Sequence, residues 1–359
     1  ASVVLTGSTA TAQEFLRMRP TIDLIAETGG KNSMIITSMA DRDLAIKDLV
    51  HSAFSYAGQK CSACSLAILE KEVYYDPDFR RQLRDAAISM HVGSPWDLST
   101  RINPLIRTPN PQLLRGLTTL EEGEEWLLQP VQDPKNCQLW SPGIKLGVRE
   151  GSFMHQTELF GPVLSVMCAE DLEHAVRLAN GTPYGLTAGI HTLDEREWKM
   201  WLEAIVAGNC YINRSITGAI VRRQPFGGCK GSSFGLGAKA GGPDYVLQFM
   251  RPTAKGLPKE REPIDSALVE LNLYVHKQQM TREEIDLWMA SIGSYAFYWN
   301  RYFSRSHDPS NVLGQDNLFC YTGQTGLVLR IHPEDILLDV FRTMAAALTC
   351  GVPVEISAA

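Results

Sequence analysis

The chain has 359 residues and a net charge of −6, with 44% hydrophobic and 21% charged residues. This composition excludes a disordered or collagen-like chain, and the acidic balance disfavours nucleic acid and anionic membranes as partners. No apolar run approaches the roughly 20 residues that a membrane span requires. The eight cysteines are scattered rather than clustered as in a small secreted domain, so a reduced, cytoplasmic location is expected. The length predicts two or three compact units.

The first elements form a predicted strand, turn and helix. Val3–Leu5 is a β-branched run that meets Gly7 and Ser8, and Ala10–Met18 has a helix-compatible composition. Such a turn presents backbone N–H groups at a helix N-terminus, where a phosphate can bind. Without a GxGxxG pattern, however, it is more often an ordinary turn. Since the strand begins abruptly, the chain is expected to be a fragment of a longer polypeptide.

Strands then alternate with helices as far as about Gly208, which predicts a three-layer α/β fold. The predicted strands are Ile22–Ala26, Met34–Thr37, Leu66–Leu69 and Val73–Tyr75, and the predicted helices are Asp41–Ser55 and Asp78–Met90.

The last third of the chain reads as a separate unit. Pro252–Pro263 combines prolines with a run of charges and is interpreted as a linker. Two helical segments, Ser266–Met280 and Arg282–Trp299, follow it. The sequence then predicts a strand at Thr325–Ile331, a helix at Pro333–Leu348 and a second strand at Val352–Ile356.

Cys61 is a candidate nucleophile. It follows Gly58-Gln59-Lys60 and is predicted to begin a short helical segment, where the helix N-terminus and a nearby cation would lower the thiol pKa. Most cysteines are instead small buried hydrophobes. Cys64 completes a Cys-x-x-Cys pair, which is typical of zinc or redox sites. Since no second pair and no thioredoxin-like unit accompanies it, Cys64 is predicted to pack in the core.

Glu27 is a candidate general base. It precedes Gly29-Gly30 in a predicted loop between strands, where an acid is usually solvated. A base that activates water must instead be partly desolvated, with a raised pKa. The glycines let their backbone approach another element closely, so the carboxyl can face a cleft.

Glu27-Thr28-Gly29-Gly30-Lys31 and Gly58-Gln59-Lys60-Cys61, with 34 positions between acid and thiol, resemble the paired signature of the aldehyde dehydrogenase superfamily. Further segments resemble that family in its own order. They are Thr6–Thr9, Val92–Pro95, Asn103–Ile106, Glu158–Val163, Ala179–Leu186 and Pro225–Lys230.

Three segments narrow the resemblance. Glu27–Asn32, Cys61–Ser65 and Thr217–Gly228 are similar to the branch that oxidises L-glutamate γ-semialdehyde, the Δ1-pyrroline-5-carboxylate dehydrogenases. Residues 265–359 resemble the additional C-terminal domain of long bifunctional proline-catabolic enzymes of the PutA type, whose upstream flavin-dependent proline dehydrogenase domain this chain does not contain.

The resemblance implies an aldehyde dehydrogenase-like three-layer α/β fold with a truncated Rossmann-type NAD domain. The expected domains, in chain order, are a remnant of the NAD-binding domain at 1–27, a catalytic domain at 28–240 that can return to the NAD domain near its end, an oligomerisation strand at 241–252, a linker at 253–264 and an additional, truncated C-terminal α/β domain at 265–359.

The resemblance also implies site roles and partners. Cys61 would be the nucleophile and Glu27 the general base, with no metal ion. The remaining roles are Gly7 and Ser8 at the pyrophosphate of NAD, Glu158 at the nicotinamide ribose, Phe160 near the nicotinamide ring, and Ser62, Gly218 and Ala219 at the α-carboxylate of the aldehyde substrate. FAD is expected only on the covalently linked proline dehydrogenase domain, and a homo-oligomer is expected.

Some alternatives remain open at this point. The family's second oxyanion donor would lie before Ala1, so the isolated fragment is expected to be inactive. The substrate could be another semialdehyde, such as succinate semialdehyde, or the chain could be a non-catalytic assembly module. Lys31 and Lys230 lie inside motifs, but solvation in a loop explains a lysine equally well, so neither is assigned a catalytic role. His155 is interpreted as structural.

Overall fold

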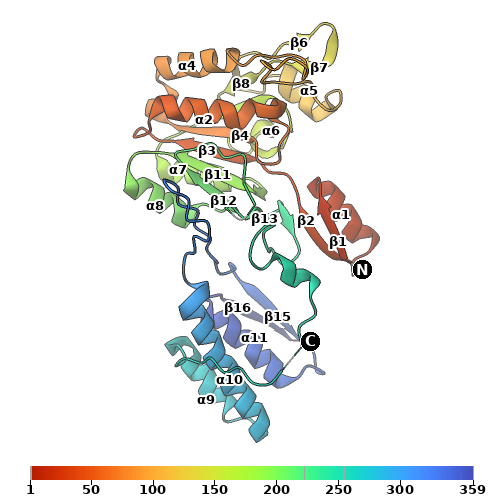
Figure 1. The fold of residues 1–359 in the computed structure, drawn as a ribbon, viewed down its shortest axis with the longest axis vertical. Helices are drawn as coiled ribbons and strands as arrows, with labels where there is room; N and C mark the ends of the chain where they lie inside the picture. Colours follow the sequence, from red (N-terminus) through yellow and green to blue (C-terminus); the bar gives the residue numbers. More distant parts are fainter. Residues whose placement is uncertain (1, 222, 254, 359) are drawn as a thin grey trace. The chain divides into compact units, whose positions relative to one another are not determined.

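The chain divides into two compact units, Ala1–Gln248 and Phe249–Ala359. The computed structural model, drawn in Figure 1, describes residues 2–221, 223–253 and 255–358. The division falls within the expected 241–252 segment, so the expected linker at 253–264 belongs to the second unit. There the N–H of Glu262 donates to the carbonyl of Gly293 (3.0 Å), and its carboxylate pairs with Arg301 (2.6 Å). In the described part of the chain, no helix is both long and apolar enough to span a membrane.

The core of the first unit is a seven-stranded sheet of order β12-β11-β3-β4-β9-β8-β5, parallel except for β5. Its strands are β3 (Asn32–Ile36), β4 (Cys64–Glu70), β5 (Glu125–Leu128), β8 (Gly143–Leu146), β9 (Val163–Ala169), β11 (Thr187–His191) and β12 (Asn209–Ile212). The central strands are buried on both faces, which explains their nearly continuous apolar sequence.

Helices cover both faces of this sheet. The connection from β3 to β4 through α2 (Arg42–Phe54) runs in one direction across the sheet, whereas that from β9 to β11 through α7 (Leu172–Asn180) runs in the other. Because such crossovers are right-handed, the two helices lie on opposite faces, which confirms three layers. Figure 1 shows α4 (Pro77–Ile88) beside α2 and α8 (Glu195–Ala204) beside α7.

The predicted strand Val73–Tyr75 is wrong, because this segment lies in a one-turn helix, α3 (Lys71–Tyr74). The N–H of Tyr75 donates to the carbonyl of Lys71 (2.9 Å). Periodicity cannot separate strand from helix in so short an apolar run. Two further short helices are α5 (Pro111–Thr118) and α6 (Phe153–Gln156).

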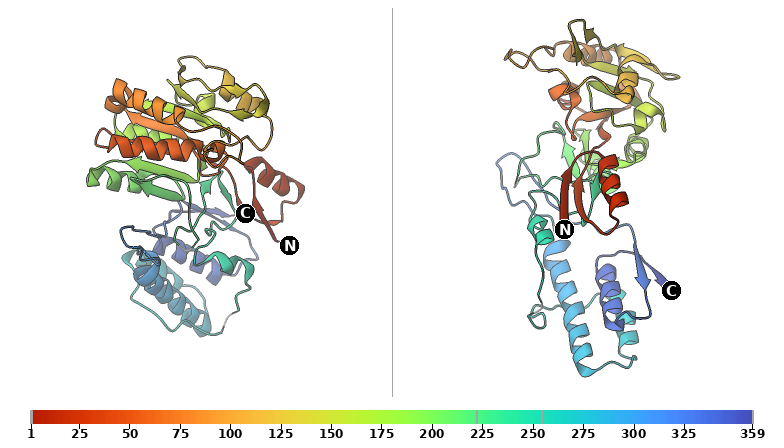
Figure 2. Two further views of the ribbon diagram at one scale, coloured as in Figure 1. Left: turned by 45° about the horizontal axis from the view of Figure 1, so that its top comes forward. Right: turned by 90° about the vertical axis from the view of Figure 1, so that its right-hand side faces the viewer.

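A second, smaller sheet contains β1 (Ser2–Thr6), β2 (Asp23–Glu27) and β14 (Ser233–Phe234). β1 and β2 are parallel and are joined by α1 (Thr9–Met18), beside which they lie in Figure 2. β14 pairs antiparallel with the end of β2, so a segment some two hundred residues later joins the first residues in one sheet. Two-stranded pairs complete the unit: β6 (Gln132–Asp133) with β7 (Asn136–Trp140), and β10 (Tyr184–Gly185) with β13 (Cys229–Lys230).

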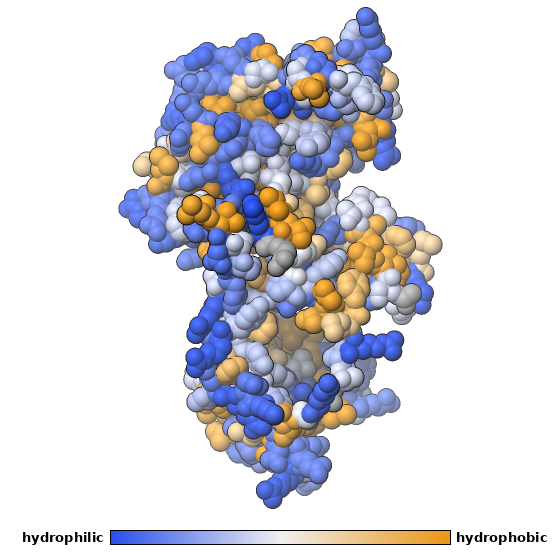
Figure 3. All heavy atoms as spheres, in the orientation of Figure 1, coloured by the Kyte–Doolittle hydropathy of each residue, from blue (hydrophilic) through white to orange (hydrophobic). Residues whose placement is uncertain are grey.

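The expected oligomerisation strand is not a strand in this structure. Tyr245–Phe249 forms a 3-10 helix, η2, in which the N–H of Leu247 donates to the carbonyl of Asp244 (3.1 Å). These turn bonds satisfy the backbone locally, whereas a strand would need a neighbouring strand. Val246 and Leu247 remain exposed. On the face drawn in Figure 3, several orange, hydrophobic groups stand apart among hydrophilic ones.

The second unit packs helices around Trp288. It contains η3 (Ser266–Leu268), α9 (Val269–Val275), α10 (Arg282–Tyr298), the π-helical turn η4 (Trp299–Phe303), β15 (Leu327–Ile331), α11 (Leu337–Thr349) and β16 (Val354–Ala358). Thr281 and Glu284 form a capping box that fixes the start of α10. β15 and β16 are parallel and joined by α11, so the predicted strand-helix-strand arrangement is confirmed. The apolar core includes Trp288, Ile292 and Phe341.

Candidate active site

The candidate site lies where the two sheets of the first unit meet. Glu27 closes β2, and Asn32 opens β3 only five positions later. The turn that carries Cys61 lies directly before β4. The site is therefore built at the carboxyl end of the small sheet and at the amino end of the large one.

Glu27 is a desolvated carboxyl. Its Oε2 accepts a hydrogen bond from the N–H of Gly228 (3.1 Å), and its Oε1 accepts one from the hydroxyl of Ser233 (3.4 Å). Burial raises the pKa of Glu27 from 4.5 to about 7, although these two bonds and the nearby Lys239 each lower it. The predicted pKa rise is confirmed, and it suits a group that must both accept and release a proton near neutral pH.

Cys61 lies in a turn between the 3-10 helix η1 (Ser55–Gly58) and β4, so the predicted helical position is wrong. The predicted lowering of its pKa is wrong as well. Burial raises the pKa of the Cys61 thiol, and the carboxylates of Glu158 and Glu27 raise it further. The ammonium group of Lys60 lies over the ring of Tyr56, 4.1 Å from its centroid.

Cys64 is a core residue, as predicted. It is 1% exposed, and burial raises the pKa of its thiol to about 12, which keeps it protonated. The described part of the chain contains no group of three or more His, Cys, Asp or Glu residues that could hold a metal ion.

Glu158 lies against the glycine loop that follows Glu27. Its Oε1 accepts a hydrogen bond from the N–H of Gly30 (3.1 Å), and a Cβ atom on Gly29 would lie 1.8 Å from its Oε2. Glycine at position 29 leaves room for the carboxylate where it lies, so the close approach expected of the glycine backbone to another element is observed. Burial raises the pKa of Glu158.

The segment after Glu158 packs on the residues before Cys61. The carbonyl of Phe160 accepts a hydrogen bond from Nε2 of Gln59 (3.2 Å). A Cβ atom on Gly58 would lie 2.3 Å from the carbonyl oxygen of Gly161. Phe160 has a positive φ of 54° and is 39% exposed.

Gly7 and Ser8 lie beside Glu27. The N–H of Gly7 donates to the carbonyl of Glu27 (3.2 Å), and the hydroxyl of Ser8 caps α1 by accepting from the N–H of Thr11 (3.2 Å). The hydroxyl of Thr9 donates to the carbonyl of Gly231 (2.9 Å), which ties the start of α1 to the later segment. The first turn of α1 has no acidic residue, so its N–H groups suit an anion.

Three residues are expected at the substrate carboxylate: Ser62, Gly218 and Ala219. In the part of the chain that the structure describes, no hydrogen bond joins them to one another. Ser62 is buried, next to Cys61, whereas Gly218 is exposed with a φ of 86°. The loop that carries Gly218 and Ala219 is held by the N–H of Ile216, which donates to the hydroxyl of Ser52 on α2 (3.1 Å).

Lys31 is buried, so solvation in a loop does not explain this lysine. Its side chain donates to the carbonyl of Ser65 (3.3 Å), and burial lowers the pKa of its ammonium group to about 8. Lys230 donates to the carbonyls of Asn180 (2.8 Å) and Thr182 (3.3 Å). His155 is fully buried and bonded to the carbonyl of Leu178 (2.9 Å), as expected of a structural residue.

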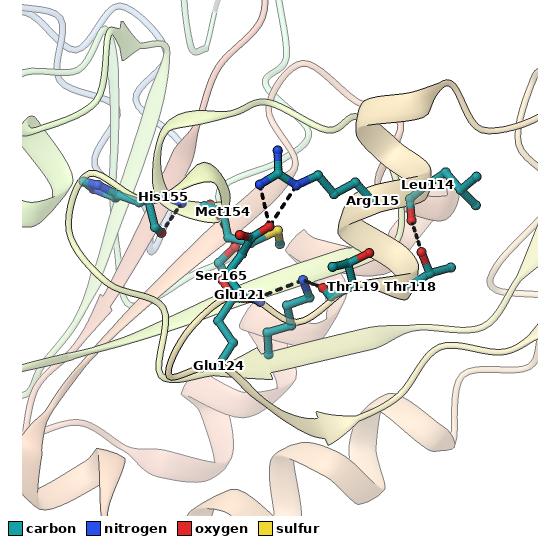
Figure 4. Close-up of polar contacts among 11 residues, drawn as sticks. Leu114, Arg115, Thr118, Thr119, Glu121, Glu124, Met154, His155 and Ser165 are labelled. Atoms are coloured by element: carbon teal, nitrogen blue, oxygen red, sulfur yellow. Dashed lines mark hydrogen bonds and ion pairs between the residues drawn. The ribbon is translucent and has the colours of Figure 1, made fainter.

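A buried ion pair supports the sheet near Lys31. Lys145 and Glu124 lie 3.1 Å apart with side chains that are each 1% exposed, and Lys145 also donates to the carbonyl of Thr119. Figure 4 shows Glu124 and Thr119 beside the pair formed by Arg115 and Glu121 (2.7 Å). Of these charges, Lys145 lowers the pKa of the Lys31 ammonium group and Glu124 raises it.

Sequence reasoning missed Gly228 and Ser233 as partners of Glu27. Gly228 lies in the Pro225–Lys230 segment, which was identified without a role, and the β-branched and aromatic pattern that normally signals a strand is absent around the two-residue β14. Nothing local could therefore have indicated that Ser233 approaches Glu27.

Comparison with known proteins places these features in a family. The pattern described as "Aldehyde dehydrogenase family" matches residues 1–254. The 1-pyrroline-5-carboxylate dehydrogenase of Bacillus subtilis (strain 168) is 37% identical over 229 residues, which are 64% of this chain and 44% of that protein.

Solved structures similar to this chain include proteins with the same name as its sequence relatives. Proline Utilization A (PutA) from Corynebacterium freiburgense is 41% identical with a TM-score of 0.89, covering 99% of this chain and 35% of that one. A 1-pyrroline-5-carboxylate dehydrogenase from Thermus with bound NAD is 31% identical with a TM-score of 0.63, covering 69% of this chain and 49% of that one. The chain thus spans less than half the length of these relatives. With its thiol, its two carboxyls and its glycine loop in one site, the chain belongs to the aldehyde dehydrogenase family.

Proposed function

We propose that the protein containing this chain oxidises L-glutamate γ-semialdehyde to L-glutamate with NAD+ as the oxidant, in proline catabolism. The observation that carries the proposal is the convergence of Glu27 and Glu158 on Cys61 in a partly buried site, where both carboxylates act on the thiol. Relatives and solved neighbours named 1-pyrroline-5-carboxylate dehydrogenase and PutA support the substrate.

Cys61 supplies the nucleophile. After its thiol proton has left to solvent, its sulfur attacks the aldehyde carbon as the thiolate and forms a thiohemiacetal, whose oxyanion can accept a hydrogen bond from the N–H of Cys61. NAD+, when bound, supplies the acceptor for the hydride that leaves this carbon. The acyl group then remains on Cys61 as a thioester.

Glu27 completes the reaction. Its carboxylate takes a proton from a water molecule, whose oxygen attacks the thioester carbon and releases the carboxylic acid and the Cys61 thiol. The pKa of about 7 lets Glu27 hold this proton transiently.

The residues near α1 fit a dinucleotide. Gly7 and Ser8 lie at the start of a ten-residue helix whose first N–H groups lack acceptors within the helix. Glu158 would hold the nicotinamide ribose and Phe160 would pack near the ring. Ser62, Gly218 and Ala219 would anchor the α-carboxylate of the substrate through hydroxyl and N–H donors.

Further proposals concern the whole protein. A PutA neighbour named as bifunctional supports a bifunctional arrangement. The resemblance seen in the sequence implies that the second part is a covalently linked proline dehydrogenase domain with FAD. A homo-oligomer is supported by the exposed Val246 and Leu247 of η2, and sedimentation of the full-length protein tests it. A cytoplasmic location agrees with eight cysteines among which the described chain forms no disulfide.

Turnover by the full-length protein tests the mechanism. Cys61→Ala is expected to abolish NADH formation from L-glutamate γ-semialdehyde. Glu27→Ala is expected to give a burst of one NADH per site and then stop, because the thioester forms but is not hydrolysed. Full steady-state activity in Cys61→Ala, or faster oxidation of succinate semialdehyde by the wild type, would contradict the proposal.

A further inference from the structure

Asn32 uses its side-chain amide to bind the turn that carries Cys61. Its Nδ2 donates to the carbonyl of Cys61 (2.7 Å) and to the carbonyl of Ala63 (2.9 Å). Its Oδ1 accepts from the N–H of Thr187, the first residue of β11 (3.0 Å). Asn32 is 2% exposed, so both amide hydrogens and the amide oxygen are engaged inside the protein.

The sheet cannot make these bonds itself. β3 and β4 change register between Asn32 and Ser33, where Asn32 is opposite Cys64 and Ser33 is opposite Leu66. The carbonyls of the preceding turn therefore lie beyond the regular ladder. Buried carbonyls without partners are costly, and the amide of Asn32 supplies the donors.

The bond to the carbonyl of Cys61 has a consequence on the other side of the same peptide unit. That carbonyl and the N–H of Ser62 belong to one planar group and point in opposite directions. Holding the carbonyl therefore fixes where the N–H points. The N–H groups of Ser62 and of Cys61 itself act on the thiol and favour its ionised form.

The other groups around the thiol act against ionisation. Glu27 from the end of β2 and Glu158 from the loop before β9 both repel a thiolate. The phenol of Tyr211, on β12, also lies within the influence of the Cys61 thiolate, which raises the pKa of Tyr211. Because burial adds to these effects, the two backbone N–H groups carry much of the stabilisation of the thiolate.

We propose that Asn32 is a positioning residue, whose amide holds the carbonyls of Cys61 and Ala63 and thereby directs the N–H of Ser62 at the sulfur of Cys61. The proposal rests on Cys61 being the nucleophile of the proposed reaction. Asn32 acts on the substrate only through Cys61.

The test is the pH dependence of Cys61 alkylation in the full-length protein. Iodoacetamide is applied between pH 7 and pH 11, and the peptide containing Cys61 is quantified by mass spectrometry. In Asn32→Ala the midpoint of the alkylation profile is expected to rise by about one pH unit, because the N–H of Ser62 is no longer held towards the thiolate and its hydrogen bond to this charged group is weakened. At a fixed pH below both midpoints, alkylation is then about tenfold slower.

Two further variants make the result decisive. Asn32→Ser retains a hydroxyl that can donate to one carbonyl, so a smaller shift of the same sign is expected, and it carries the test if Asn32→Ala does not fold. Asn180→Ala is the matched control. Asn180 similarly donates to the carbonyl of Ala204 (2.9 Å) and accepts from the N–H of Val206 (2.8 Å), away from Cys61.

Folded Asn32 variants with the wild-type alkylation midpoint would overturn the proposal, as would an equal shift in Asn180→Ala. The midpoint does not depend on turnover. A shifted midpoint in a protein that does not oxidise the aldehyde would therefore refute the proposed function alone.

Discussion

Replacing Glu27 by glutamine is expected to make the first unit more stable at alkaline pH while removing the general base. The pKa of Glu27 is about 7 in the folded chain and 4.5 ordinarily. Below pH 4.5 the carboxyl is protonated in both states. As the pH rises towards 7, the unfolded chain loses this proton but the folded chain retains it, so stability falls.

The size of the effect follows from the two pKa values. A difference of about 2.5 corresponds to roughly 3 kcal/mol, and solvent access to the partly buried carboxyl reduces this to about 2 kcal/mol between pH 5 and pH 8. Glutamine has no such titration. The hydrogen bonds that glutamine makes to Gly228 and Ser233 differ in strength from those of the acid. This difference changes the free energy of unfolding by the same amount at each pH.

The assay is urea unfolding at pH 5 and pH 8, in a Cys61→Ser background that removes the titration of the thiol. The free energy of unfolding of Glu27→Gln, relative to that of its parent, should be larger by about 2 kcal/mol at pH 8 than at pH 5, which means that the variant is relatively more stable at pH 8. Glu203→Gln, at an exposed position on α8, should show no such difference. Equal effects of Glu27→Gln at the two pH values would refute a desolvated, proton-retaining Glu27.

Three other perturbations test the site and its support. Gly29→Ala places a Cβ atom 1.8 Å from Oε2 of Glu158, so it should cost about 1–3 kcal/mol of unfolding free energy; Glu158→Ala should remove most of this cost, and additive effects in urea unfolding would argue against the contact. Lys145→Met leaves the buried carboxylate of Glu124 unpaired and should cost about 3–5 kcal/mol, whereas adding Glu124→Gln should recover part of it; a neutral Lys145→Met in the same assay would contradict burial of the pair. Alkylation of Cys61 should have its midpoint above pH 9.0, and Glu158→Gln should lower that midpoint because it removes a charge that raises the thiol pKa; an unchanged midpoint would place Glu158 outside the influence of the thiol.

The sequence was most informative where the signal was local or was carried by a motif. The central strands could be located because both of their faces are buried, which leaves apolar runs such as Met34–Thr37. The raised pKa of Glu27 followed from its expected role as a base, because a base near neutral pH must be desolvated.

Other features depended on contacts that a local pattern does not contain. The turn at Cys61 is shaped by Asn32 and by the packing of Gly58 on Gly161, so the expected helix start was wrong. Lys31 is buried because its loop connects two interior strands. Tyr245–Phe249 has the composition of a strand, yet it bonds within itself as a 3-10 helix.

The pairing of β14 with β2 also sets the order of events during synthesis. Ser233 is 206 residues beyond Glu27, and a ribosome that adds roughly 5–20 residues per second needs about 10–40 s to cover that interval. Until then, the nascent chain contains Glu27 without the hydroxyl of Ser233, the N–H of Gly228 or the strand that covers β2. Burial of the carboxyl, and with it the raised pKa, is thus acquired late, after the thiol and the glycine loop have already been made.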